Sequence, residues 1–319
     1  MRVVLAQPRG YCAGVARAIE TVELALELHG QPVYVYHDIV HNASVVADLA
    51  RRGAVFIDDL AAAPNGAVVV FSAHGVSRDI RRQAASRKFQ IIDATCPLVT
   101  KVHLQATRLI EQGARALVIL GHADHDEVVG LVGAVDVEVR VASSIADVLA
   151  LEFPSDLALA YVTQTTLVPH DTEPLIAALT QRYPRARGTG MEGICYATLN
   201  RQRAVRRLAE HSDLVLVVGS PQSSNCRRLQ EVAADHGAPA RLVEQPEDLD
   251  RAWLEGVTRV GVTSGASTPE YLVRAVCERL RDLGATQMRV LPGLVETTRF
   301  ALPEGLDPAP EIRERHSLS

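Results

Sequence analysis

The fold is decided by residues 91–109, which read IIDATCPLVTKVHLQATRL. An apolar strand runs into Cys96, and the helix that follows has Val102, Ala106 and Leu109 at the spacing of one face. After this helix comes a second apolar strand, which leads into a cluster of polar residues. The same order of cysteine, helix, strand and polar cluster occurs three times along the chain, so each copy predicts one α/β module.

The three copies start at Cys12, Cys96 and Cys195. From each cysteine the polar cluster lies 29 residues further along the chain, at His41, His125 and Ser224 in turn. Equal offsets indicate equivalent positions in similar modules. We therefore predict an α/β protein of three similar modules, with small, mainly parallel sheets arranged around a pseudo-threefold axis and a central cofactor site.

The module boundaries follow from the repeat. The first module is expected to span residues 13–95, the second 96–191, and the third 192–285 together with 1–12, because the first strand completes the third sheet. Residues 286–319 are expected to form a C-terminal segment and tail. Within the modules, apolar runs predict strands at 33–36, 68–71, 117–120 and 214–218.

The composition is that of a well-packed protein with more than one core. With 319 residues the chain exceeds the usual size of a single hydrophobic core. Hydrophobic residues make up 47% and aromatic residues 4%, so the core must be aliphatic, which suits buried parallel sheets. The net charge of −5 argues against nucleic-acid binding, which needs clustered positive charge.

The sequence predicts a cytoplasmic protein. No apolar run reaches the roughly 18 residues of a membrane helix, and the amino terminus lacks the apolar stretch of a signal peptide. We therefore expect neither a membrane nor a nucleic acid as a partner. In the reducing cytoplasm, cysteines are more often ligands or catalysts than disulfides, and an odd number of five does not allow full pairing.

A cysteine at the start of a helix lies at the positive end of the helix dipole, which lowers its pKa and stabilises the thiolate that a metal needs. Three such thiolates could hold zinc with a fourth ligand, or a cubane iron–sulfur cluster in which one iron lacks a protein ligand. The spacing does not decide between these cofactors. Cys226 and Cys277 have no counterpart in the repeat, and we expect structural roles for both.

The polar clusters hold short, neutral or weakly basic donors, which suit a compact anion such as diphosphate. The candidate binding residues are His41, His74, His125, Ser223, Ser224, Asn225 and Ser267. Only two lysines occur, Lys88 and Lys101, and there is no Gly-x-x-x-x-Gly-Lys motif, so a P-loop is absent. Glu127 is the candidate for proton transfer, with Thr165 placed by the repeat to relay the proton or orient a substrate hydroxyl.

Several short motifs closely resemble those of the 4-hydroxy-3-methylbut-2-enyl diphosphate reductase family, in the same order and across residues 1 to about 300. They lie at 8–15, 40–42, 72–77, 93–103, 163–166, 194–198, 223–225 and 265–267. The resemblance implies an oxidoreductase of the last step of the non-mevalonate isoprenoid pathway. Such an enzyme removes a hydroxyl group reductively from an allylic diphosphate and gives isopentenyl and dimethylallyl diphosphates.

The resemblance also implies roles for the candidate residues. Cys12, Cys96 and Cys195 would hold a 4Fe-4S cluster, and the iron without a thiolate would act on the substrate hydroxyl as a Lewis acid. Electrons would arrive singly from a ferredoxin or flavodoxin, while Glu127 delivers a proton with help from Thr165. The diphosphate would be held by His41, His74, Ser223, Asn225 and Ser267, with Ser224 and His125 completing the pocket.

Two positions depart from the usual pattern of this family. Asp126 stands where a proline is usual, and Cys226 stands where serine or another small polar residue is more common. Two alternatives to the reductase stay open: a zinc-dependent hydrolase with a site of three cysteines, and a non-catalytic iron–sulfur redox sensor. The group of hydrogen-bond donors that suit an anion argues against the sensor, because a sensor needs no pocket for a small anion.

Overall fold

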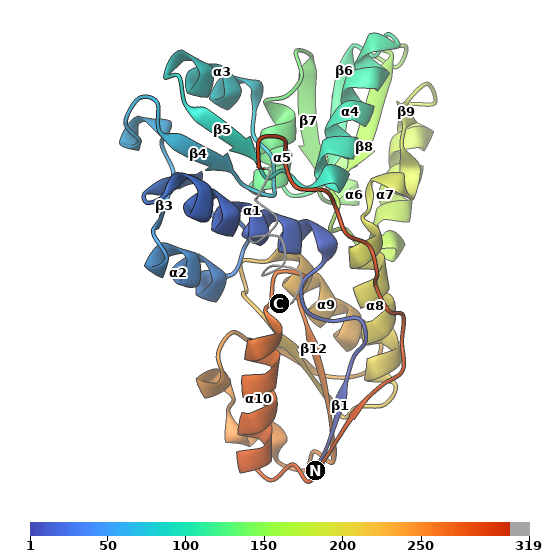
Figure 1. The fold of residues 1–319 in the computed structure, drawn as a ribbon. Helices are drawn as coiled ribbons and strands as arrows, with labels where there is room; N and C mark the ends of the chain where they lie inside the picture. The colour runs from blue at the N-terminus through green and yellow to red at the C-terminus, as the bar shows by residue number, and fades with distance from the viewer. Residues whose placement is uncertain (307–319) are drawn as a thin grey trace. The chain divides into compact units, whose positions relative to one another are not determined.

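The structure is a computed structural model in which residues 1–306 are described. The described chain forms two compact units, each made of separate stretches of sequence (Figure 1). Unit 1 comprises Met1–Val15, His41–Val45 and Cys195–Thr298, and unit 2 comprises the other described residues. Each unit is therefore stabilised by contacts between segments that are far apart in the sequence.

Unit 1 contains one five-stranded sheet, in the order β11-β10-β12-β1-β13, in which every pairing is parallel. Its strands are β1 (Arg2–Leu5), β10 (Leu214–Val218), β11 (Ala240–Val243), β12 (Arg259–Ser264) and β13 (Gln287–Val290). β10 is buried at every position, as expected for a continuous apolar run in a parallel sheet that is covered on both faces. β1 pairs with both β12 and β13, so early and late parts of the chain share one sheet.

Helices cover the faces of this sheet. They are α8 (Tyr196–Ala209), α9 (Ser224–Asp235) and α10 (Glu270–Asp282), with short 3-10 helices η3 (Pro246–Asp248) and η4 (Arg251–Leu254). α10 buries Leu272, Val273, Val276 and Leu280 in one cluster with side chains of the strands. α8 lies on the opposite side of the sheet from α10 (Figure 1). The core of unit 1 is therefore aliphatic, as the composition predicts.

Unit 2 contains two four-stranded parallel sheets, in the orders β3-β2-β4-β5 and β7-β6-β8-β9. The strands of the first are β2 (Val33–Tyr36), β3 (Ala54–Ile57), β4 (Val68–Phe71) and β5 (Gln90–Asp93). Those of the second are β6 (Ala116–Leu120), β7 (Glu138–Ala142), β8 (Leu159–Thr163) and β9 (Arg187–Gly188). The inner strands β6 and β8 are buried throughout, whereas the edge strand β7 alternates between exposed and partly buried residues over most of its length.

Two further sets of helices complete the described chain. The α-helices are α1 (Ala13–His29), α2 (Ala43–Arg51), α3 (Arg78–Ser86), α4 (Pro97–Glu111), α5 (Asp126–Val132), α6 (Ile145–Leu149) and α7 (Pro169–Arg182). The short 3-10 helices are η1 (Leu60–Ala62) and η2 (Gly190–Gly193). α5 packs tightly on the loop after β4, because a Cβ added at Gly130 would lie only 3.2 Å from Gly75 O. Glycine permits this close approach, which fixes α5 against that loop.

The three small parallel sheets with their helices confirm the predicted α/β fold class. The strands predicted at 33–36, 68–71 and 214–218 have the predicted bounds, and the strand predicted at 117–120 begins one residue earlier. In the part of the chain that the structure describes, no helix is long and apolar enough to cross a membrane.

The C-terminal segment contributes to a sheet. Within residues 286–319, which were expected only as a segment and tail, β13 pairs with β1 at the edge of the unit 1 sheet. The part of this tail after residue 306 lies outside the described residues. The module boundaries and the pseudo-threefold arrangement stay predictions.

Candidate functional site

Each of the three cysteines of the repeat lies immediately before a helix. Cys12 precedes α1, Cys96 is the N-cap of α4, and Cys195 is the N-cap of α8. None of the five cysteines forms a disulfide, and these three are partly exposed, whereas Cys226 and Cys277 are buried. The predicted helix starts are thus confirmed, and each of the three cysteines lies at the positive end of a helix dipole.

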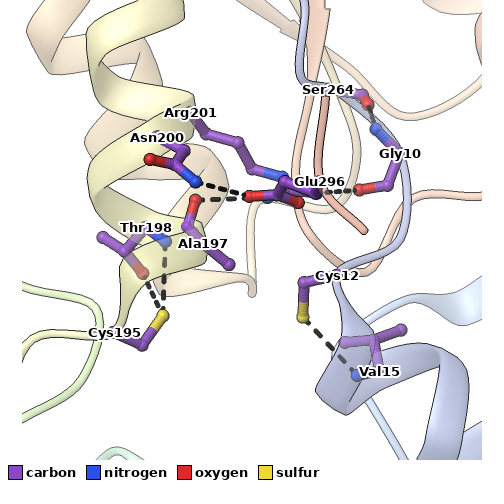
Figure 2. A network of polar contacts seen from close by, with 10 residues as sticks. All are labelled: Gly10, Cys12, Val15, Cys195, Ala197, Thr198, Asn200, Arg201, Ser264 and Glu296. Atoms are coloured by element: carbon purple, nitrogen blue, oxygen red, sulfur yellow. Dashed lines mark hydrogen bonds and ion pairs between the residues drawn. The ribbon is translucent and has the colours of Figure 1, made fainter. Parts of the chain in front are cut away.

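The two repeat cysteines of unit 1 accept backbone hydrogen bonds at sulfur (Figure 2). Cys195 Sγ accepts from Thr198 N at 3.2 Å and lies 3.0 Å from Thr198 Oγ1. Cys12 Sγ accepts from Val15 N at 3.5 Å. Both sulfur atoms therefore lie at the start of a helix, partly exposed, and their role as metal ligands stays a prediction.

Both of these cysteines affect the pKa of one tyrosine, Tyr196. Burial raises the pKa of Tyr196, a hydrogen bond with Thr298 opposes the shift, and the charges of Glu296, Cys12 and Cys195 raise the pKa further. Because Coulomb interactions weaken with distance, a contribution from both cysteines means that both lie near this ring. Unit 1 therefore brings two of the three predicted ligands into one neighbourhood.

A buried arginine forms hydrogen bonds with several segments near these two cysteines (Figure 2). Arg201 of α8 is fully buried and donates to Gly10 O at 2.7 Å, to Ala197 O at 3.1 Å and to Glu296 Oε2 at 3.0 Å. Asn200 Nδ2 also donates to Glu296 Oε1, at 3.0 Å. The loop before Cys12, the helix after Cys195 and the C-terminal segment are thus held by one side chain, whose charge is compensated by a carboxylate.

Sequence reasoning missed Arg201 and Glu296. A signal was present, because Ala197, Arg201, Ala204 and Leu208 follow one another at helical spacing along the buried face of α8. A charge on an apolar stripe requires a partner within the fold. The sequence does not show that this partner lies 95 residues further along.

In unit 2, Cys96 is held just beyond the carboxyl end of β5. Its N–H donates to Ala73 O at 2.9 Å, and the carbonyl of the preceding Thr95 accepts from Arg17 Nη1 at 3.1 Å. Burial lowers the pKa of Arg17, and the charges of Asp93 and Cys96 oppose that shift. Arg17 therefore lies near Cys96 and is bonded to the residue that precedes it.

The other two cysteines are poor ligand candidates. Burial raises the pKa of Cys226 to about 11, so this residue stays a neutral thiol at physiological pH. Its Sγ fills the space beside Gly219, where an added Cβ would lie 2.6 Å away. Burial also raises the pKa of Cys277, whose side chain belongs to the cluster beneath α10. The packing of both supports the structural roles predicted for them.

Glu127 is a buried carboxyl group bonded to Thr165. It is 3% exposed, in the first turn of α5. Thr165 N donates to Oε1 at 2.8 Å, and Thr165 Oγ1 donates to Oε2 at 2.7 Å. Burial raises the pKa of Glu127 from 4.5 to about 7, although both hydrogen bonds from Thr165 oppose this shift. Near neutral pH the group can hold a proton and release it, as a general acid must.

Two histidines lie at the strand ends beside this carboxyl group. His125 caps α5 and accepts from Glu127 N through Nδ1 at 3.2 Å, so the neutral imidazole carries its proton on Nε2. The ring of His74, in the loop after β4, meets the His125 ring edge to face at 5.9 Å between centroids. Unit 2 therefore brings His74, His125, Glu127 and Thr165 together.

Asp126, the residue that replaces the usual proline, lies between two histidines. Its Oδ1 is 3.6 Å from His37 Nδ1, and its Oδ2 is 3.7 Å from His74 Nδ1. The Asp126 carboxylate raises the pKa of His37, while burial opposes the shift. His37 was not among the predicted site residues, although its place directly after β2 matches the other strand-end polar residues. Of the two adjacent carboxyl groups, Glu127 is buried, whereas Asp126 is partly exposed and lies close to His37 and His74.

Asp126→Asn is expected to lower the pKa of His37, because the variant removes the negative charge that favours the imidazolium. An NMR titration of the imidazole signals measures this shift, and His37→Gln identifies the signal. A raised pKa in the fold stabilises the protein below the ordinary value of 6.5, and this stabilisation is lost as the pH rises through the higher folded value. The free energy of unfolding should thus differ more between variant and wild type in acid than at pH 8. An unchanged His37 titration would contradict the assignment.

The polar candidates of unit 1 gather at the start of α9. Ser223 is its N-cap and accepts from Cys226 N at 3.4 Å, and Ser224 and Asn225 form the first turn. Asn225 is buried, yet among residues 1–306 neither its amide nitrogen nor its amide oxygen has a hydrogen-bond partner. Leaving such a group unpaired costs about 1–3 kcal/mol, so this amide fits a bound ligand. The helix N-terminus favours a negatively charged one.

Ser267 belongs to the same unit. It follows β12, and its hydroxyl donates to His41 O at 3.1 Å. The predicted site residues thus fall into two groups. Unit 1 holds Cys12, Cys195, His41, Ser223, Ser224, Asn225 and Ser267, and unit 2 holds Cys96, His74, His125, Glu127 and Thr165. The roles assigned to these residues stay predictions.

Known proteins resemble this chain over nearly its whole length. The family model described as LytB protein matches residues 3–281. The 4-hydroxy-3-methylbut-2-enyl diphosphate reductase of Glaesserella parasuis serovar 5 is 50% identical over 309 residues, which cover 96% of this chain and 98% of the relative. The 4-hydroxy-3-methylbut-2-enyl diphosphate reductase 2 of Burkholderia mallei is 50% identical over 305 residues, covering 96% and 93%.

Solved structures show the same likeness. The E-1-hydroxy-2-methyl-but-2-enyl-4-diphosphate reductase from Plasmodium falciparum superposes with a TM-score of 0.91 at 37% identity, covering 98% of each chain. The resemblance seen in the sequence motifs is therefore confirmed. This chain belongs to the LytB protein family, the family shared with these 4-hydroxy-3-methylbut-2-enyl diphosphate reductases.

Proposed function

We propose that this chain reduces 4-hydroxy-3-methylbut-2-enyl diphosphate to isopentenyl diphosphate and dimethylallyl diphosphate. The observation that carries the proposal is Glu127, a buried carboxyl group with a pKa of about 7 that is bonded to Thr165. Loss of a hydroxyl group as water needs a proton donor that still holds its proton near neutral pH. The identity of the substrate is taken from the names of the relatives, which are 50% identical over almost the whole chain.

We infer that Cys12, Cys96 and Cys195 hold a 4Fe-4S cluster. The donor set fits, because three partly exposed thiols each begin a helix, and two of them accept hydrogen bonds at sulfur. Thiolates are the soft ligands that such clusters require. When bound, the cluster would supply electrons one at a time and a Lewis-acidic iron position without a protein ligand.

The reaction consumes two electrons and two protons. The C–O bond of the substrate breaks, and the hydroxyl group leaves as water after it takes up one proton. The second proton and the electron pair form a new C–H bond at either of two allylic carbons, which gives the two products. Glu127 donates a proton, and the Thr165 hydroxyl, 2.7 Å from its carboxyl oxygen, holds the donor in place and can relay that proton.

The diphosphate is expected to bind at the polar strand ends. In unit 1 the unpaired Asn225 amide and the start of α9 offer hydrogen-bond donors and a favourable dipole. Ser223, Ser224, Ser267 and His41 lie in the same unit. In unit 2, His74 and His125 add donors beside Glu127. All are small or neutral groups, which suits recognition of a compact anion.

An electron-carrier protein, a ferredoxin or flavodoxin, completes the proposed reaction. A cytoplasmic location fits the partly exposed cysteines, which form no disulfide, because thiols persist in a reducing compartment. The reductases named above give no support to a zinc hydrolase or to a non-catalytic sensor.

Anaerobic purification and a dye assay test the function. The protein should be brown and contain iron and sulfide, about four of each per chain. It should oxidise reduced methyl viologen only when 4-hydroxy-3-methylbut-2-enyl diphosphate is added. A colourless zinc protein would support the hydrolase instead. A brown protein that oxidises no dye in the presence of the substrate would support the sensor.

A further inference from the structure

An open groove of about 740 Å³ runs along α4 in unit 2. Thr95 and Pro97 line it, and these two residues flank Cys96 in the sequence. The groove therefore reaches the immediate surroundings of a predicted cluster ligand. None of the residues proposed to bind the substrate lines it.

One face of α4 forms much of the groove. Pro97, Lys101, Leu104 and Arg108 line it at intervals of four, three and four residues, the spacing of one helix face. Leu104 is 52% exposed between the two basic side chains. An exposed apolar residue with a charged rim is typical of a site where a protein docks.

The basic side chains of the groove form no ion pairs with the described residues, although the charge of Asp93 acts on Arg17. Among the described residues, no carboxylate lies within ion-pair distance of Lys101, Arg108 or Arg17. Arg17 and Lys101 donate instead to the carbonyl oxygens of Thr95 and Glu192, at 3.1 and 3.3 Å. These bonds orient the two side chains and leave their charges available to a partner.

The groove also contains two acidic residues, Asp93 and Glu304. The Asp93 carboxylate already pairs with Arg81 at 2.7 Å and accepts from Thr95 N at 3.0 Å. The groove therefore holds three basic residues, and Glu304 is its one carboxylate for which no ion pair is described. Because the chain as a whole has a net charge of −5, this local excess of positive charge favours an acidic partner at the groove.

We propose that the α4 groove docks a small acidic one-electron carrier protein, a ferredoxin or flavodoxin. The proposal rests on the proposed function, in which two electrons per turnover come from outside the chain. Carboxylates of the carrier pair with Lys101 and Arg108, and an apolar residue of the carrier covers Leu104. In each encounter the carrier loses one electron and the cluster gains it, so two encounters complete one turnover. Docking beside Cys96 gives the electron a short path, and electron transfer slows steeply with distance.

A second groove provides an internal comparison. It has about 550 Å³ and lies at the other end of α4, lined by Leu109, Gln112, Arg185 and Arg187 among others. α4 has 15 residues and therefore a length of about 22 Å. The second groove is also basic, but it is separated from Cys96 by most of that length, so we expect no productive docking there.

The scarcity of lysine makes docking testable by cross-linking. The only lysines are Lys101, in the groove, and Lys88, which is exposed after α3 and outside it. A carbodiimide joins a lysine amine to a carboxylate in direct contact. With the cluster-loaded enzyme and an acidic 2Fe-2S ferredoxin, mass spectrometry should find the cross-link at Lys101. Cross-links only at Lys88 or at the amino terminus would overturn the proposal.

Charge reversal gives the second measurement. The double variant Lys101→Glu and Arg108→Glu should bind the oxidised ferredoxin about tenfold more weakly at low salt, and the difference should shrink as added salt screens the charges. Arg185→Glu, in the second groove, should bind it like wild type. Equal affinity of the double variant and wild type, or weaker binding only in Arg185→Glu, would overturn the proposal.

The same variants separate this proposal from the proposed function. Methyl viologen needs no docking site, so the double variant should keep wild-type turnover with that dye and lose it with ferredoxin. If wild type itself shows no substrate-dependent oxidation of the dye, the proposed function fails. The position of the cross-link still decides whether the groove binds the carrier.

Discussion

Glu127→Gln is expected to lower turnover about 10²–10⁴-fold while the iron and sulfide content stays at the wild-type level. Glutamine keeps the shape of the side chain and can still bond to Thr165, but it has no acidic proton to donate. The Cys96 loop and the other cysteines do not depend on this group. Steady-state dye oxidation measures turnover, and visible absorption of the cluster provides the control for folding. Wild-type turnover in this variant would remove Glu127 from the mechanism.

The pH dependence gives a second measure of the same residue. The protonated form is the active one, so kcat/KM should fall as the pH rises through about 7. In Glu127→Gln, the kcat/KM of the small remaining activity should not fall as the pH rises through about 7. A wild-type profile that is flat between pH 6 and pH 8 would show that Glu127 does not control the step.

Stability should change with pH in a matching way. The folded pKa lies above the ordinary 4.5, so between 4.5 and about 7 the unfolded chain loses its proton while the folded one keeps it. The free energy of unfolding therefore falls over this range, by about 3 kcal/mol in total. Glutamine has no charge to bury, so the variant should be more stable than wild type at pH 8. Denaturant unfolding of both proteins at pH 5 and pH 8 tests this difference.

Cys195→Ser is expected to abolish activity and most of the bound iron. Serine keeps the N-cap but replaces the soft sulfur atom, which accepts from Thr198 N at 3.2 Å and lies 3.0 Å from Thr198 Oγ1. The matched control is Cys226→Ser, because Cys226 has the same chemistry but is buried as a neutral thiol. The control should keep its iron, sulfide and colour.

Iron and sulfide analysis after anaerobic reconstitution measures both cysteine variants. A full cluster in Cys195→Ser would exclude that residue as a ligand. Iron loss in Cys226→Ser, with an intact fold by circular dichroism, would contradict the structural role of Cys226. Cys277→Ser provides a further control, since that side chain lies in the cluster beneath α10.

The sequence predicts the inner parts of the fold well, because those parts have one dominant pattern. β2, β4 and β10 are continuous apolar runs within parallel sheets, and their bounds agree with the structure. A glycine just beyond a helix is a common stop signal, and α1 ends at His29, with Gly30 N donating to Leu26 O at 3.0 Å. Here local preference and burial favour the same structure.

Two edge strands, β7 and β13, were not predicted from the sequence, for a physical reason. β7 and β13 each pair with one neighbour and expose several residues, so charged side chains interrupt their apolar runs. β13 has the sequence Gln287-Met288-Arg289-Val290, in which no residue is buried. Its pairing with β1 depends on backbone groups, about which side-chain patterns say little.

The candidate site was predictable where residues recur at a fixed offset, and not where partners are distant. The offset identified the three cysteines that precede helices and the equivalent polar positions His41, His125 and Ser224, and the structure adds the hydrogen bond between Glu127 and Thr165. The offset could not reveal the pairing of Asp126 with His37, because that contact depends on how α5 packs against the end of β2. Nor could it reveal the link from Arg201 to Glu296.

The pairing of β1 with β12 and β13 has a consequence for synthesis of the protein. Cys12 is made before its partners, because its loop is held by Arg201 and its strand by residues 259–262 and 287–290. During translation this part of the chain therefore carries an unpaired apolar strand and an unsupported thiol until residue 290 has been made. If Cys12 binds iron as proposed, a chain that stops before β13 is expected to lack a stable metal centre.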